Sequence, residues 1–262
     1  MKIYLKLALA TAAVLPGTAL AQLPLNTGLD YTNFTLYPTP TGSSSVADNY
    51  WILVSSSGPL VPATPGVPRP AYVVNTSSSW APPLSSPPPG SRWISATPTS
   101  ASLPGASSSN PSYFIFRKCF CLMNGYKNVQ ISYSLRADEG TQVWLNTLGQ
   151  VMSGPSPVNF GPSSPPVNGG TNNAQWFHTG LNCMYVLVED TGGLTGVNLA
   201  GQVSGLGVMA TAGAGSANPP SFAPCQCGGP TGTAAAKESR ATLQAIVQYA
   251  EARLRERKAA AK

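Results

Sequence analysis

The sequence predicts an all-β fold of antiparallel strands that ends in one amphipathic α-helix. Short runs in which apolar residues alternate with polar ones recur along the chain, and they are rich in β-branched and aromatic residues. Clusters of Pro, Ser and Gly separate these runs, and no amphipathic helical pattern occurs before residue 234. Parallel strands would need crossover connections, so these strands should pair antiparallel in a sandwich or barrel.

The N-terminal segment has the pattern of a secretory signal peptide. Residues 1–21 carry Lys2 and Lys6, an apolar run, and the small-x-small sequence Ala19-Leu20-Ala21. We expect cleavage before Gln22 and export of the mature chain to the extracellular space, the cell surface or the periplasm. No later segment reaches the ~18 consecutive apolar residues of a membrane span, so no integral membrane segment is expected after cleavage.

Composition divides the mature chain into four parts: an N-terminal extension at 22–46, a β-sandwich domain at 47–216, a Cys-, Gly- and Pro-rich linker at 217–233, and a C-terminal helix at 234–262. Intervening segments such as "WAPPLSSPPPGSR" contain prolines that cannot continue a hydrogen-bond ladder. Within the sandwich, the alternating pattern predicts strands at 51–54, 71–74, 113–122, 129–135, 142–145, 183–188 and 197–208.

The formal net charge of +6 is located at the two ends of the chain. Between Gln22 and Ala236, six basic residues balance six acidic ones, whereas the last 26 residues hold seven Lys or Arg and three Glu. A body without net charge lacks the basic surface of a nucleic-acid-binding domain. Nucleic acid is therefore excluded as an expected partner.

The C-terminal segment predicts a helix of about 25 residues that begins at Ala234, with Thr233 as its N-cap. A helix of this length with one narrow apolar stripe is marginal in water, so it should have a partner surface. Three partners are open: the chain's own sandwich, a second copy bound through the stripe, or an anionic surface bound through Arg253, Arg255, Arg257 and Lys258. The stripe consists of Leu243, Ile246, Val247, Ala250 and Leu254.

The order of several short motifs resembles a known family. The motifs are Asp48 with Trp51, "AYVV" at 71–74, Trp80, "SRWIS" at 91–95, "YFIFRKCFCL" at 113–122, "RAD" at 136–138, "VWLN" at 143–146, "GLN" at 180–182 before "YVLV", and "TGV" at 195–197. Over residues 47–212 they are similar to the galactose-binding-like jelly-roll module of secreted bacterial proteins, many of which carry PEP-CTERM-type surface-sorting tails.

The resemblance implies a β-sandwich of jelly-roll type that binds a ligand or builds a structure more often than it catalyses a reaction. This chain departs from the family pattern in two ways. Thr147 follows Asn146 where the family usually has Gly, and no Pro-Glu-Pro signal followed by a membrane span and a basic end is present. The second departure argues against PEP-CTERM sorting.

Motifs for catalysis are missing from the sequence. The one histidine, His178, lies in a loop sequence, and G-x-S-x-G, H-E-x-x-H and the G-x-x-x-x-G-K phosphate loop do not occur. We therefore expect a protein that is not an enzyme and has no catalytic cofactor. The alternative is a secreted carbohydrate-active hydrolase, which needs two carboxyl groups roughly 5 to 10 Å apart. Asp138 with Glu189 or Asp190 would supply that pair.

Two C-x-C pairs suggest disulfides. Cys119 and Cys121 point to one face of a predicted strand, and Cys225 and Cys227 precede the helix. In an exported chain these four cysteines are disulfide candidates that would join the linker to the sandwich, with the pairing left open. Cys183 is then left over as a buried, free or intermolecular thiol. A four-thiolate metal site is the alternative, although C-x-C is not the usual zinc spacing.

Aromatic side chains are the main candidates for ligand contact. An indole can stack on the apolar face of a sugar ring while amide and guanidinium groups bind its hydroxyls. Trp144 alternates with two apolar neighbours, so it should face outward if they face the core. Trp176 lies in a Gly- and Asn-rich loop. The predicted ligand-binding residues are Trp144, Asn146, Trp176 and Arg92.

Asp138, Glu139 and Gly140 stand between two predicted strands and predict a tight turn. Asp138 would accept hydrogen bonds from the backbone amides just ahead of it, while Gly140 takes the positive φ. Adjacent residues of a strand point to opposite faces, so the two carboxylates are not expected to act as a catalytic dyad. A structural calcium ion bound partly by Asp138 is one further option.

These patterns predict an exported, non-enzymatic protein for extracellular binding or surface assembly. Its partner would be an extracellular glycan recognised by the sandwich, or copies of itself that form an extracellular structure through the C-terminal helix. A hydrolase with paired carboxylates is the alternative function.

Overall fold

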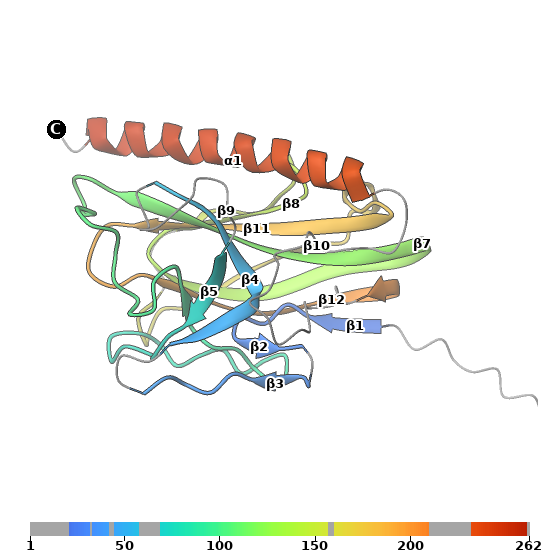
Figure 1. Cartoon of the computed structure of the whole chain (residues 1–262), viewed down its shortest axis with the longest axis horizontal. Helices are drawn as coiled ribbons and strands as arrows, with labels where there is room; N and C mark the ends of the chain where they lie inside the picture. The colour runs from blue at the N-terminus through green and yellow to red at the C-terminus, as the bar shows by residue number, and fades with distance from the viewer. Residues whose placement is uncertain are drawn as a thin grey trace, which may run out of the picture.

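The chain forms an antiparallel β-sandwich with a C-terminal helix across one outer face, which confirms the predicted fold class (Figure 1). The computed structural model describes residues 21–31, 33–41, 45–57, 69–156, 160–209 and 232–260, with the backbone alone for 232–239. The elements are β1 (Ala21–Pro24), β2 (Leu29–Asp30), β3 (Thr35–Leu36), β4 (Val46–Ser56), β5 (Arg69–Val73), β6 (Ile94–Ser95), β7 (Ser112–Asp138), β8 (Thr141–Leu145), β9 (Val151–Ser156), β10 (Val167–Thr171), the 3-10 turn η1 (Ala174–Trp176), β11 (Gly180–Asp190), β12 (Gly196–Met209) and α1 (Gly232–Ala260).

The long strand β7 organises the sandwich because its two halves pair with different neighbours. Residues 112–122 pair mainly with β11 and partly with β4, whereas residues 127–138 pair mainly with β12 and partly with β10; the end of β12 also reaches Cys121 and Leu122. Between the halves, Gly125 and Asn128 have positive φ angles of 80° and 52°, and the register with β12 shifts. The sequence predicts two separate strands here, and the structure joins them in one bent strand.

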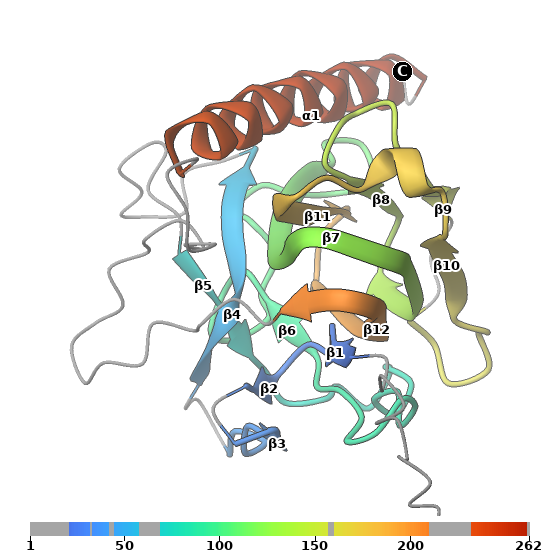
Figure 2. The ribbon, with the colours of Figure 1, turned by 90° about the vertical axis from the view of Figure 1, so that its right-hand side faces the viewer.

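The strands of the main sheet follow the order β1-β12-β6-β5-β4-β7-β11-β8-β9, with β10 paired to β7. Because β12 pairs with both β6 and β7, the strands β7, β4, β5, β6 and β12 close into a ring. β11, β8 and β9 continue the sheet beyond this ring, and α1 lies above them (Figure 2).

Alternation along β7 separates two hydrophobic clusters. Phe114, Phe116 and Phe120 belong to the main core inside the sandwich. Tyr113 and Ile115 belong to a second cluster, which lies between the sheet and α1. Both faces of this half of β7 are therefore covered, which explains why its residues are almost continuously apolar.

The segment at 21–31 is part of the sandwich. β1 pairs with β12 from Ala21 onward, and Leu25 and Leu29 are fully buried in the main core. Asp48 on β4 accepts a 2.7 Å hydrogen bond from the backbone N–H of Gly28, and burial raises the pKa of this carboxyl to about 6. The signal peptide predicted at 1–21 falls almost entirely outside the described residues.

Helix α1 begins at Gly232, two residues before the predicted start. Thr233 therefore lies inside the helix, and its prediction as the N-cap is wrong. The last turn of α1 carries Arg257 and Lys258, which interact favourably with the negative C-terminal end of the helix dipole. Within the described part of the chain, no helix combines the length and hydropathy needed to cross a bilayer.

The apolar stripe predicted on this helix packs on the chain's own sandwich. Ile246, Ala250 and Leu254 are buried, and Leu243 and Val247 pack against the same cluster. Burial of an aliphatic side chain contributes about 1.5–3 kcal/mol, so these contacts can stabilise a helix that would be marginal alone. Of the three predicted partner surfaces, the stripe uses the chain's own sandwich and is not exposed for a second copy.

Candidate ligand-binding groove

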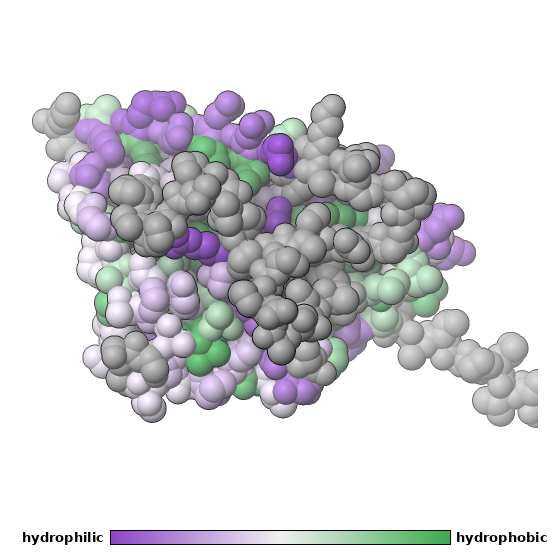
Figure 3. Space-filling view, viewed as in Figure 1, coloured by the Kyte–Doolittle hydropathy of each residue, from purple (hydrophilic) through white to green (hydrophobic). Residues whose placement is uncertain are grey.

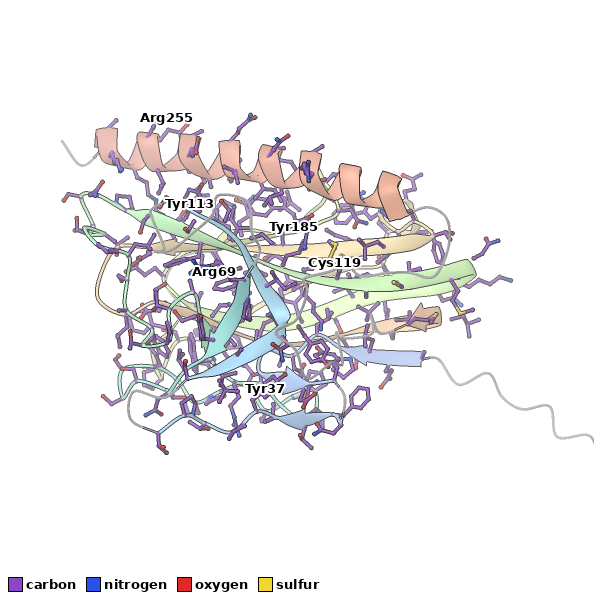
Figure 4. The ribbon with its side chains drawn as sticks, in the orientation of Figure 1. Tyr37, Arg69, Tyr113, Cys119, Tyr185 and Arg255 are labelled. Atoms are coloured by element: carbon purple, nitrogen blue, oxygen red, sulfur yellow. A yellow bond between two sulfur atoms is a disulfide. The ribbon has the colours of Figure 1, made fainter. Side chains whose placement is uncertain are left out.

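Trp144 is buried, so its prediction as an exposed ligand contact is wrong. The predicted orientation holds: Val143 and Leu145 belong to the main core, whereas Trp144 points to the other face of the sheet. However, α1 covers that face, and Trp144 is fully buried with its ring 5.5 Å from that of Tyr249 in an edge-to-face contact. Figure 4 shows Tyr185, from the same buried cluster, beneath the helix.

Asn146 joins η1, β11 and the helix rather than facing a ligand. Its Nδ2 donates to the backbone oxygen of Trp176 at 2.8 Å and to Oδ1 of Asn182 at 2.9 Å. Its Oδ1 accepts from the backbone N–H of Cys183 at 2.8 Å, and its backbone oxygen accepts from the Thr242 hydroxyl at 2.6 Å. Both amide protons are therefore used within the protein. The prediction that this buried side chain binds ligand is wrong.

The backbone of Asn146 also explains why no glycine follows it. Asn146 itself has a φ of 57°, a left-handed conformation that Asn tolerates better than most residues. Thr147 has no positive φ and can therefore occupy the next position, where the family that the sequence resembles usually has Gly. The motif at 143–146 thus describes a strand end and its turn.

The other two predicted ligand residues have different neighbours: the Trp176 backbone lies beside Asn146, whereas Arg92 lies beside Tyr37. Trp176 is half-buried in η1 and packs against the main core. Arg92 donates from Nε to the backbone oxygen of Tyr37 at 3.3 Å, and its Cβ lies close over Gly28. Tyr37 appears in Figure 4 near β2 and β3, on the side of the sandwich opposite to α1. The four predicted residues therefore do not form a common site.

The residues 138–140 form a turn of a different kind from the predicted one. Asp138 is buried and accepts a 2.6 Å hydrogen bond from the indole N–H of Trp80, while Glu139 has the positive φ of 135°. Gly140 has no positive φ, but a Cβ there would lie 2.6 Å from Oε2 of Glu189, so this buried and ion-paired side chain would have to shift. Burial and, to a lesser extent, the charge of Asp190 raise the pKa of Asp138 to about 6, although the bond from Trp80 opposes this rise.

The carboxylates considered for hydrolysis or calcium binding have structural partners. Asp190 accepts hydrogen bonds from the backbone N–H of Leu103 and the hydroxyl of Ser112, both at 3.0 Å. Glu189 forms ion pairs with Arg253 at 2.6 Å and Arg257 at 2.7 Å. Among the residues that the structure describes, no three His, Cys, Asp or Glu side chains are grouped to hold a metal ion. Asp138 therefore has no neighbouring set of such ligands for calcium.

Cys119 and Cys183 form a disulfide, with Cα atoms 4.1 Å apart. The two residues are direct partners in the register of β7 and β11. The prediction that leaves Cys183 unpaired and joins Cys119 to the linker is therefore wrong, because strand register cannot be derived from the spacing of cysteines. Cys121 is also disulfide-bonded, whereas Cys225 and Cys227 lie outside the described residues.

A polar groove of about 360 Å³ lies between the C-terminal half of α1 and the segment 103–113. The helix contributes Glu251, Arg255 and Lys258, which share one flank because they are spaced by four and three residues. The opposite wall consists of Pro104, Pro111 and Asn110, among others. Figure 4 places Arg255 on α1 above Tyr113, which lies at the start of β7 and also lines the groove.

The two flanks of α1 differ in how their cations are used. Arg253 and Arg257 face Glu189 on one flank, and this buried carboxylate compensates part of their charge. Arg255 and Lys258, on the groove flank, form no ion pair with any residue that the structure describes. Glu251 is the acid that lines the groove beside them, so the groove carries two cations and one anion. Figure 3 shows hydrophilic side chains along the outer surface of α1.

No family model, curated protein or solved structure matches the chain. The resemblance to the galactose-binding-like module therefore stays a prediction. The groove combines access, polar groups and charge.

Sequence patterns identify only part of this groove. Arg255 and Lys258 belong to the basic cluster predicted to bind an anionic surface. The opposite wall, "LPGASSSNPSY" at 103–113, has no recognisable motif, because its Ser, Pro and Gly residues are typical of any loop. The two walls meet only because α1 packs back on the sheet.

Proposed function

We propose that this protein is an exported, non-enzymatic binding protein that takes a glycan in the groove between α1 and the segment 103–113. The observation that carries this proposal is the lining of the groove, which combines cations, a carboxylate, hydroxyls and an amide with proline side chains. Its volume of about 360 Å³ lies within the range of small-molecule sites, roughly 300–1,000 Å³.

The mixture of groups suits a ligand that bears many hydroxyls. Asn110 uses Nδ2 to donate to the backbone oxygen of Gly105 at 2.9 Å, so its Oδ1 can accept from a sugar hydroxyl. The Ser57 hydroxyl accepts from the backbone N–H of Tyr113 at 2.9 Å and keeps its own proton for donation. Pro104 and Pro111 offer the apolar surface that the C–H face of a sugar ring needs.

Export is supported by the N-terminal pattern and by the disulfide between Cys119 and Cys183, because disulfides persist in oxidising compartments. The alternative of a paired-carboxylate hydrolase has less support. Asp138, Glu189 and Asp190 are all buried, and each one already binds a structural partner. Self-association through the helix stripe also has less support, because the sandwich buries that stripe.

The proposal can be tested with a glycan array and two matched variants. Asn110→Trp places a large ring in the groove, whereas Asn124→Trp alters an exposed Asn near the bend of β7. The 12 residue-to-residue steps from Ser112 to Asn124 correspond to roughly 40 Å of extended strand, so the control lies far from the groove. We expect the chain from Gln22 to bind at least one glycan, Asn110→Trp to lose that binding, and Asn124→Trp to retain it. Binding unchanged in Asn110→Trp would contradict the groove as the site.

A further inference from the structure

We infer that the ligand of this groove is an acidic glycan, whose carboxylate is bound by Arg255 and Lys258. This inference rests on the proposed glycan-binding function and adds the chemical class of the ligand. It comes from the distribution of charge around α1, which the fold creates and which the overall composition of the chain does not reveal.

The first step is the direction in which the cations face. Positions 251, 255 and 258 lie on the flank of α1 that lines the groove, and positions 253 and 257 lie on the flank that faces Glu189. Arg255 is exposed and Lys258 is half-buried, so both can reach a bound ligand. Leu254 lies between the two flanks, is buried against the sheet and fixes the rotation of the helix.

The second step is the charge balance. Glu189 is almost completely buried and binds Arg253 and Arg257, so these two guanidinium groups are already engaged. Arg255 and Lys258 have no comparable carboxylate partner among the described residues. A carboxylate on the ligand would compensate the positive charge of Arg255 and Lys258, as Glu189 compensates that of the other flank.

The third step distinguishes a uronate from a more densely charged polymer. Glu251 also lines the groove, and its charge disfavours ligands with many closely spaced phosphates or sulfates. The same carboxylate can accept hydrogen bonds from sugar hydroxyls. A glycan with about one carboxylate on each sugar and free hydroxyls between them, as in polymers of uronic acids, matches this arrangement of groups.

The test compares acidic with neutral glycans, and one pair, polygalacturonate and its methyl ester, shares a backbone. The probes are polygalacturonate, alginate and hyaluronan, with methyl-esterified polygalacturonate, galactan and dextran as neutral counterparts. The full chain from Gln22 is titrated by calorimetry at low and at high salt, together with the double variant Arg255→Gln, Lys258→Gln. The control is Arg240→Gln, which changes an exposed arginine of α1 that does not line the groove. Circular dichroism checks that each variant is folded.

We expect at least one acidic glycan to bind about tenfold more tightly than its neutral counterpart, since each partly exposed ion pair is worth up to about a fivefold change in Kd. The double variant should lose this preference, and the Arg240 variant should keep it. Equal binding of acidic and neutral glycans would overturn the inference while the proposed function stands. A similar loss in the Arg240 variant would overturn the assignment to Arg255 and Lys258. Binding to none of the six probes would overturn the acidic class, and an empty glycan array would overturn the function as well.

Discussion

The ion pairs of Glu189 should hold the C-terminal half of α1 on the sandwich, and Glu189→Gln tests this directly. The Glu189 side chain is 4% exposed, and its oxygens lie 2.6 Å and 2.7 Å from the guanidinium groups of Arg253 and Arg257. Glutamine has nearly the same shape but no charge, so the substitution removes both ion pairs and leaves little change in packing. The expected consequence is easier release of the helix from the sheet.

The free-energy cost of Glu189→Gln depends on how well water can hydrate the two arginine side chains that lose their partner. Removal of one member of a fully buried ion pair costs about 3–5 kcal/mol, because the remaining charge stays without water. Here the Arg253 side chain is 19% exposed and that of Arg257 46% exposed, so water can compensate part of the loss. We therefore expect a cost of about 2 kcal/mol, which corresponds to an increase of about 30-fold in the opening equilibrium of this end of the helix.

Hydrogen exchange measured by mass spectrometry reports that opening equilibrium. In Glu189→Gln, amides of the C-terminal half of α1 should exchange about 30-fold faster than in the wild type, while amides of β12 keep their rates. Glu256→Gln is the matched control, since Glu256 is an exposed glutamate of the same helix segment. Unchanged exchange of α1, or equally accelerated exchange of β12, would refute the role assigned to Glu189.

Three further changes test the fold around the site. Gly140→Ala should destabilise the protein by about 1–3 kcal/mol in urea unfolding, because the new Cβ would lie 2.6 Å from Oε2 of Glu189. The control Gly149→Ala should be nearly neutral, because the nearest atom to its new Cβ lies at 4.0 Å. The pKa of Asp138 is raised to about 6 from its ordinary 3.8, so this group stabilises the folded state most below pH 4 and loses that contribution as the pH rises through 6. Asp138→Asn should therefore reduce the change in the free energy of unfolding between pH 4 and pH 6 by roughly 1–2 kcal/mol. A curve with the wild-type slope would contradict this cause. The double variant Cys119→Ala, Cys183→Ala should lose about 2–4 kcal/mol, because the disulfide spans 64 residues and restricts the unfolded chain; an unchanged urea midpoint would argue against that contribution.

Local sequence patterns predicted the direction of side chains well. The alternation around Trp144 correctly places it opposite to Val143 and Leu145, and the spacing of the helix stripe correctly identifies the buried face of α1. Both predictions use the periods of a strand and a helix, which depend only on neighbouring residues. The polar and proline-rich segments likewise separate the predicted strands of the sandwich.

Contacts between distant residues could not be predicted in the same way. The sequence places Trp144 on an outward face but does not show that α1 covers this face. It shows five cysteines but not the register that sets Cys119 opposite Cys183. It contains Asn146 in a suggestive motif, although the hydrogen bonds to Trp176, Asn182 and Thr242 engage it within the protein.

The sequence by itself therefore determined the fold class, the faces of its strands and the apolar stripe of its helix, since each depends on a local period. Only the tertiary structure decided which faces reach solvent, which carboxylates are engaged, and where the cations of α1 point. The physical reason is that exposure and charge balance belong to pairs of distant residues. When α1 packs against the sheet, it buries the predicted aromatic site, and the same packing forms the groove that contains Arg255 and Lys258.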